Sequence, residues 1–197
     1  MPSHSIADLL SRQQELAART SKVVGAFRSF RQALFDCLAK FAEEAAAQGL
    51  QGATRPEMAR GEGDFVEWRM TINRYPLVMV TTNDAMPLDL TSDELVCRVF
   101  VYRSSEPEDV TPLAHIVFHE KANDQFAASI QWFTTEGPKS LGGTPPFTPE
   151  LILKGGKDMA DRLLDLMYWL RNSWVEKPLL SEIRKDHAAV RSLGFRT

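Results

Sequence analysis

Residues 5–48, SIADLLSRQQELAARTSKVVGAFRSFRQALFDCLAKFAEEAAAQ, decide the fold, and they contain no proline and a single glycine, Gly25. Apolar residues recur three and four positions apart, the spacing that places side chains on one face of an α-helix. Ser5 followed by Asp8 is a start signal, and Gly49 marks the end. The stretch therefore predicts one long helix, continuous or kinked at Gly25.

The apolar stripe of this predicted helix is thin in its N-terminal half and thick in its C-terminal half. One heptad position carries Ile6, then the polar Gln13 and Thr20, and aromatic or aliphatic residues from Phe27 onward. An unbroken helix would be about 65 Å long, whereas a compact domain of this chain length is about 40 Å across. The N-terminal half is therefore expected to overhang, and its apolar residues are the predicted partner-binding residues: Ile6, Leu9, Leu10 and Leu16.

Beyond residue 64 the period of the apolar residues changes from 3.6 to 2, which is typical of half-buried strands. Five segments have this pattern: residues 65–73, 77–82, 94–103, 113–120 and 125–134. Because most of the links between them are short, they predict an antiparallel meander. Residues 51–64 are interpreted as a surface connector, and residues 136–149, rich in Gly and Pro, as a loop.

Two helices are predicted after the sheet, one over residues 157–174 and a short one after Pro178. The glycines at 155 and 156 are interpreted as a hinge rather than as an anion site at a helix N-terminus. The predicted fold class is α+β, with a long N-terminal helix, a five-stranded antiparallel meander and C-terminal helices on one face. Residues 1–50 form the long helix, its N-terminal half an oligomerisation arm, and residues 51–197 share one core with residues 24–45.

Composition narrows the class of protein. The net charge of -3 gives no general attraction to nucleic acid or to anionic lipid, so nucleic acid is not the expected partner. No segment reaches 18 consecutive apolar residues and no signal peptide is recognisable, so we expect a cytoplasmic protein without a membrane partner. Cys37 and Cys97 lie in apolar patterns and are expected to be reduced.

No motif of catalysis, cofactor binding or metal binding stands out in the sequence. His115 and His119 have the four-residue spacing of a helical zinc pair, but they lie in a predicted strand. Four residues along a strand span about 13 Å, too far for one metal ion. The sequence thus predicts no catalytic residue, no metal and no cofactor.

Two functions remain open. The leading hypothesis is a non-enzymatic protein–protein interaction module, adaptor or chaperone-like, that acts through the long helix as a coiled coil. It binds itself or another protein, and a homodimer is favoured. The layout resembles that of small acidic bacterial secretion chaperones and other dimeric adaptors. The alternative is a small-molecule-binding domain or an enzyme that uses a candidate ligand face of the sheet, formed by Arg69, Arg98, Tyr102, His115 and His119.

Overall fold

A computed structural model describes residues 6–49, 54–72, 75–88, 92–102, 112–134 and 137–173. Helix α1 (Ile6–Ala47) opens the chain and runs without a break through Gly25. Eight strands follow: β1 (Glu57–Glu62), β2 (Phe65–Ile72), β3 (Tyr75–Thr82), β4 (Met86–Pro87), β5 (Leu95–Tyr102), β6 (Pro112–Glu120), β7 (Phe126–Thr134) and β8 (Gly137–Gly143). A short 3-10 helix (Pro149–Leu151) leads into α2 (Ile152–Ser173). The predicted helix after Pro178 lies outside the described residues.

The strands form one antiparallel sheet with the order β1-β2-β3-β5-β6-β7-β8, in which β4 pairs with β5 alone. Strands that follow one another along the chain are therefore neighbours in the sheet, apart from β4. The antiparallel arrangement is confirmed, but the predicted number of five strands is wrong. The five predicted segments correspond to β2, β3, β5, β6 and β7.

The missed strands lack the apolar alternation on which the prediction depended. β1 (EMARGE) is an edge strand whose described side chains are all exposed, so neither of its faces requires apolar residues. β8 (GPKSLGG) is the opposite edge and contains three glycines and a proline, which are tolerated at an edge. Because of this composition, the sequence predicted a surface connector where β1 lies and a loop where β8 lies.

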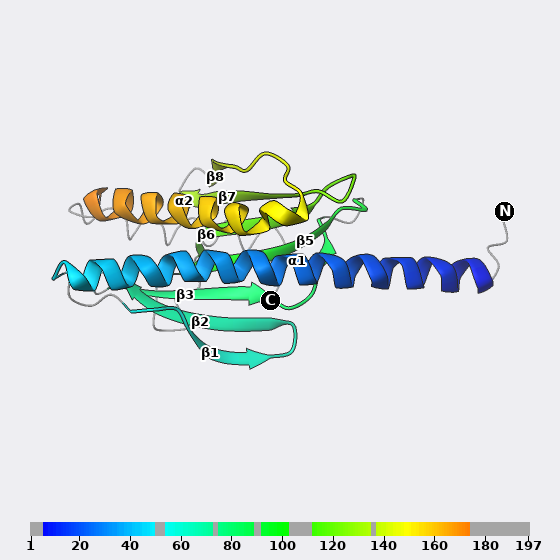
Figure 1. The fold of residues 1–197 in the computed structure, drawn as a ribbon, viewed down its shortest axis with the longest axis horizontal. Coiled ribbons are helices and arrows are strands. Elements are labelled where there is room, and N and C mark those ends of the chain that lie inside the picture. Colours follow the sequence, from blue (N-terminus) through cyan, green and yellow to red (C-terminus); the bar gives the residue numbers. More distant parts are fainter. Residues whose placement is uncertain are drawn as a thin grey trace.

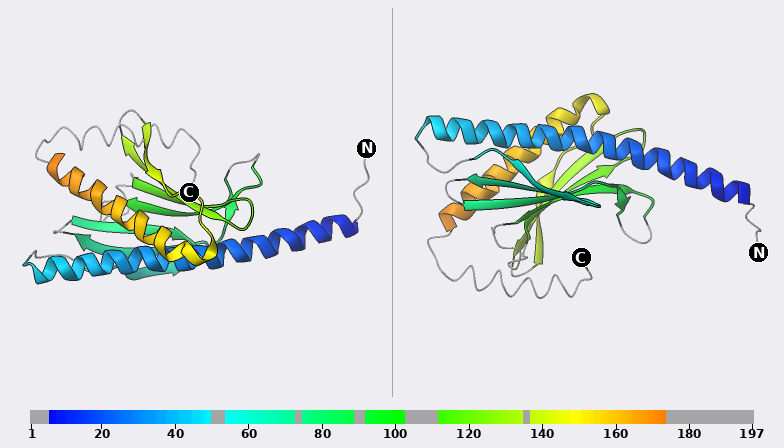
Figure 2. Two further views of the ribbon diagram at one scale, coloured as in Figure 1. Left: turned by 45° about the horizontal axis from the view of Figure 1, so that its top comes forward. Right: turned by 90° about the horizontal axis from the view of Figure 1, so that it is seen from below.

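Helices α1 and α2 lie on the same face of the sheet (Figures 1 and 2), where a single hydrophobic core forms. The largest fully buried side chains come from α1, from every second residue of the strands, and from α2: Phe27, Phe30, Leu34, Leu38, Leu77, Met79, Ile116, Phe118, Phe126, Ile130, Met159 and Leu163. Phe30 packs against Phe118 with a ring-centroid distance of 5.0 Å. The core thus joins α1 from Val23 onward to the sheet and α2.

Two glycines interpreted as a hinge are closely packed positions of α2 instead. Gly155 and Gly156 lie in the first turns of α2, which begins at Ile152 rather than near residue 157. A methyl group on Gly156 would sit 2.5 Å from the carbonyl oxygen of Phe30 in α1, and one on Gly155 would sit 2.8 Å from the ring of Phe147. These positions need glycine because the backbone of α1 and an aromatic ring approach too closely for a Cβ atom.

Among the described residues, no helix is both long and apolar enough to cross a membrane.

Candidate functional site

Residues 6–22 of α1 form an arm that extends beyond the end of the sheet (Figures 1 and 2). No side chain of the arm is buried, and Val23 is the first residue of α1 that is. The arm is about 25 Å of helix, on an α1 that is about 63 Å long in all. The conflict between helix length and domain size is therefore resolved by an overhang, not by a break at Gly25.

The four apolar residues predicted to bind a partner are all exposed on this arm. Their side chains are exposed by 77% at Ile6, 54% at Leu9, 54% at Leu10 and 50% at Leu16. Leu9 and Leu16 lie at seven-residue intervals before Val23, which is buried against the sheet. Because this spacing keeps side chains on nearly the same side of a helix, the exposed stripe points the same way as the buried one. Whatever covers it must lie against the end of the sheet.

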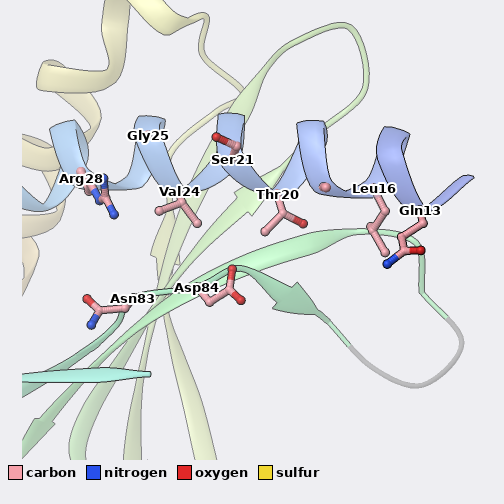
Figure 3. Close-up of a pocket in the computed structure, with 10 residues that line it drawn as sticks. Gln13, Leu16, Thr20, Ser21, Val24, Gly25, Arg28, Asn83 and Asp84 are labelled. Carbon is pink, nitrogen blue, oxygen red and sulfur yellow. The ribbon is translucent and has the colours of Figure 1, made fainter. Parts of the chain in front are cut away.

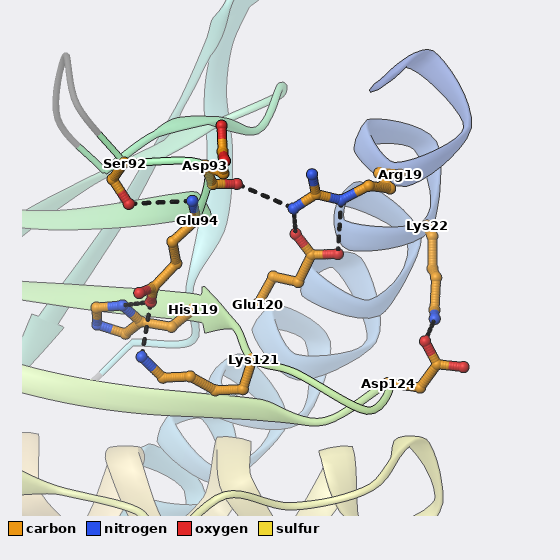
Figure 4. Close-up of polar contacts among 9 residues, drawn as sticks. All are labelled: Arg19, Lys22, Ser92, Asp93, Glu94, His119, Glu120, Lys121 and Asp124. Atoms are coloured by element: carbon orange, nitrogen blue, oxygen red, sulfur yellow. Dashed lines mark hydrogen bonds and ion pairs between the residues drawn. The ribbon is translucent and has the colours of Figure 1, made fainter. Parts of the chain in front are cut away.

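The base of the arm is held by the turn between β6 and β7 (Figure 4). Arg19 Nη2 lies 2.5 Å from the Glu120 carboxylate and donates a hydrogen bond of 2.9 Å to the carbonyl of Asp93. One turn further on, Lys22 forms an ion pair with Asp124. These contacts set the direction in which the arm leaves the domain. No local sequence pattern predicts these contacts, because the partners lie 74 to 102 residues apart in the chain.

A groove of about 650 Å³ lies beneath the base of the arm (Figure 3). The helix contributes a mixed wall that includes Leu16, Thr20 and Val24, and the turn after β3 contributes Asn83 and Asp84. Leu16 thus belongs both to the exposed stripe and to the groove. The helical part of its lining runs along α1 from Gln13 to Arg28.

Neither edge of the sheet is a simple docking edge for another strand. β1 is interrupted by a bulge between Met58 and Arg60 and begins with the charged Glu57, features that disfavour strand addition. At the other edge, Arg162 of α2 donates hydrogen bonds of 3.0 and 3.3 Å to the carbonyls of Leu141 and Gly143 in β8. The arm is therefore a better candidate interaction surface than either edge.

The face of the sheet opposite the helices brings together three of the five predicted ligand-face residues. Arg98, His115 and His119 lie on adjacent strands β5 and β6, and the register pairs His119 with Val96 and His115 with Phe100. His115 is buried, and its ring stacks on Phe100 with a centroid distance of 4.7 Å. Burial, with further contributions from Arg98 and His119, lowers the pKa of His115 to about 3. Its Nε2 makes no hydrogen bond to a described residue.

His119 belongs to a satisfied polar cluster (Figure 4). Its Nδ1 lies 2.7 Å from the Glu94 carboxylate and its Nε2 lies 3.1 Å from the Ser129 hydroxyl, while Lys121 also binds Glu94 at 2.7 Å. Burial lowers the pKa of His119 although Glu94 opposes it. The pKa of Glu94 is lowered too, since the bonds from Lys121 and His119 outweigh its burial.

The remaining two residues of the predicted ligand face lie apart from this group. Arg69 in β2 binds its neighbour Glu67 at 2.7 Å and is half exposed. The register places it opposite Val78 of β3, which in turn lies opposite Tyr102 of β5. Tyr102 is half-buried, and burial raises its pKa. The five residues thus share one face without converging on a common point.

No metal or thiol chemistry is suggested by the described part of the chain. It contains no group of three or more His, Cys, Asp or Glu residues arranged to hold a metal ion. Cys37 is half-buried and Cys97 is buried, and both are free thiols. Burial raises the pKa of Cys97 to about 12, which disfavours the reactive thiolate.

No protein-family model matches the sequence, and no curated protein or solved structure matches it either. The function is therefore argued from the geometry of the arm and of the sheet.

Proposed function

We propose that this protein is a non-enzymatic protein–protein interaction module, an adaptor or chaperone-like protein, that binds its partner through the arm. The observation that carries the proposal is the exposure, by half or more, of Ile6, Leu9, Leu10 and Leu16 on a helix that projects past its own domain. Contiguous exposed apolar side chains on a soluble domain mark contact surfaces. A helix with such a stripe binds another helix or a groove.

The anchoring of the arm supports the same proposal. A free helix of 17 residues is marginal in water, and an apolar stripe on it gains nothing until it is covered. Yet Arg19 and Lys22 tie the base of the arm to the β6–β7 turn, which holds the stripe in one orientation beside the groove. Such preorganisation lowers the entropic cost of binding a partner.

The candidate ligand face is the second possibility, favoured by the grouping of Arg98, His115 and His119. His119 is engaged with Glu94 and Ser129, and Arg98 with the carbonyl of Leu88 at 3.3 Å. His115 Nε2 has no hydrogen-bond partner among the described residues, but the residue is only 4% exposed, so this atom lies out of reach of a ligand on the surface. A catalytic or ligand-binding group needs a free polar atom within reach of the ligand. The arm is the better candidate because its apolar side chains are exposed and are not covered by other described residues of the domain.

The test compares the wild type with two doubly substituted variants that carry the same added charge. Leu9→Lys with Leu16→Lys removes the stripe, whereas Ser11→Lys with Ala18→Lys has the same spacing on the opposite side of the arm. Each tagged protein is used to recover partners from native cells, with an untagged copy of the chain included. We expect partners retained by the wild type and the control to be lost from the leucine variant. Equal retention by all three proteins contradicts the proposal.

A further inference from the structure

In residues 6–21 of the arm, each charged residue has a residue of opposite charge at the same distance on the other side of the midpoint between Gln13 and Gln14. Four charged residues occur in residues 6–21: Asp8, Arg12, Glu15 and Arg19. Asp8 precedes the midpoint by as many positions as Arg19 follows it, and Arg12 and Glu15 are placed in the same way. Their spacings of four, three and four put all of them on one stripe of the helix, and this charged stripe borders the apolar one.

We propose that the arm binds the arm of a second copy of this chain, antiparallel, about a two-fold axis at Gln13 and Gln14. This dimer rests on the proposed function of the arm, and it identifies the partner as a second copy of the same chain. In the pair, Asp8 faces Arg19 of the second copy and Arg12 faces Glu15 of the second copy, and the symmetry repeats each contact. All four of these charges thus meet the opposite sign, while Lys22 keeps its ion pair with Asp124 of its own chain. A parallel pair in register does not provide this match, since each charge then faces its own kind.

The course of α1 also excludes the parallel arrangement. The stripe that is exposed at Leu9 and Leu16 continues into Val23, Phe27 and Phe30, which are at most 1% exposed because the sheet of the same chain covers them. A parallel second helix would run along this stripe into that sheet. An antiparallel arm ends where the sheet begins, so only its first turn reaches the domain.

The apolar and amide side chains fit the same register. Leu10 faces Ala17 of the second copy, a large residue against a small one, and Leu16 lies beside the axis. Gln13 lies nearest the axis, where its amide can both donate and accept a hydrogen bond and so match an identical amide. A polar residue in the seam selects one register at some cost in affinity, so we expect a specific dimer of moderate strength.

The groove receives the end of the second arm. In this register Ile6 of the second copy lies opposite Ser21, which lines the groove together with Val24 and Asp84. The most exposed apolar residue of the arm, Ile6 at 77%, therefore moves next to the apolar part of the groove. The groove is complete as a binding site only in the dimer.

The guanidinium of Arg19 can form hydrogen bonds to its own chain and to the second copy at the same time. It binds Glu120 and Asp93 through Nε and Nη2, and its Nη1 makes no hydrogen bond to a described residue. A guanidinium has five donors in a planar fork, so Asp8 of the second copy can bind at Nη1 while Glu120 stays in place. The base of each arm would then link the β6–β7 turn to the second arm.

The first test uses charge reversal and mixing, measured by sedimentation equilibrium at low ionic strength. Arg12→Glu alone and Glu15→Arg alone each turn two attractive contacts per dimer into repulsive ones, so each variant should dimerise about tenfold more weakly or worse than the wild type. An equimolar mixture of the two should associate as a heterodimer nearly as well as the wild type, because every contact again joins opposite charges. The variant with both substitutions should dimerise by itself, and circular dichroism should show the same helix content throughout.

The second test measures orientation. A spin label on Ser29→Cys, in a Cys37→Ser background, should give an interchain separation along the helix axis of about 46 Å in the antiparallel dimer, whereas a parallel dimer brings the two labels side by side. A short distance, a mixture no stronger than its components, or a wild type that stays monomeric at high concentration would overturn the antiparallel dimer. The proposed function fails separately, when the Leu9 and Leu16 variant retains the same partners as its control.

Discussion

Arg19 in the arm and Glu120 at the end of β6 lie 101 residues apart in the chain, yet their side chains meet with 2.5 Å between Nη2 and Oε2. The pair joins the first part of α1 to the end of the central strand β6. Together with the pair formed by Lys22 and Asp124, it decides where α1 stops packing on its own domain and becomes an arm. The direction of the arm is thus a property of tertiary structure.

The first prediction concerns the energy of this pair. Arg19 is 45% exposed at its side chain, so solvent screens the attraction and we expect a coupling of about 0.2–1 kcal/mol. A double-mutant cycle with Arg19→Ala and Glu120→Ala, read from urea unfolding of dilute protein, measures it. The coupling should shrink as salt is raised from 0.01 to 1 M. A coupling of several kcal/mol, or one that ignores salt, contradicts this prediction.

The second prediction separates two glycines that the sequence does not distinguish. Both Gly156 and Gly25 lie inside helices, but a Cβ on Gly156 would sit 2.5 Å from the carbonyl of Phe30, and a Cβ on Gly25 meets nothing within 4 Å. Gly156→Ala should therefore lower the free energy of unfolding by about 1–3 kcal/mol through overpacking, whereas Gly25→Ala should raise it by about 0.5–1 kcal/mol. Denaturant melts of the two variants give both values. Effects of the same sign would show that α1 and α2 do not approach as closely as they do here.

The strong periodic signals were enough to predict the central parts of the fold. The spacing of Phe27, Phe30 and Leu34 predicted a buried helix face, and all three are buried. Phe41, Trp68 and Trp132 have the same apolar periodicity in their helix and strands, but they are only partly buried against the core.

The rest of the structure depends on contacts that no local pattern records. Gly155 and Gly156 have the composition of a hinge but lie in α2, where Phe147 and the backbone of α1 approach them too closely for a Cβ atom. At the candidate site, the apolar residues of the arm were found by comparing helix length with domain size. The groove could not be predicted from the sequence, because Asn83 and Asp84 come from a turn whose position depends on the whole sheet.

The third prediction tests the core through α1. Leu34 is fully buried, so Leu34→Ala should cost about 2–5 kcal/mol of unfolding free energy. Leu16→Ala is the matched control, since the same substitution is made in the same helix at a side chain that is 50% exposed. In dilute protein it should change the stability by no more than about 0.5 kcal/mol. If the two variants melt alike in urea, Leu34 does not lie in the core.

The fourth prediction is a pH dependence that arises from His115. Burial holds its pKa at about 3 in the folded protein, against about 6.5 in the unfolded chain. Between these values the unfolded chain binds the additional proton, so the contribution to stability is complete above pH 6.5 and is lost as the pH falls. Lowering the pH from 7 to 5 should cost about 2 kcal/mol through this group alone.

His115→Phe should remove that loss. Phenylalanine keeps the stack on Phe100 and removes the Nε2 atom, which makes no hydrogen bond to a described residue, so its stability at pH 7 should be close to that of the wild type or higher. His119→Gln is the control, because it alters the neighbouring polar cluster and leaves His115 in place. Urea melts at pH 7 and pH 5 give the comparison. If the stability of His115→Phe falls with pH as steeply as that of the wild type, His115 is protonated in the folded protein and its surroundings are wetter than the packing against Phe100 implies.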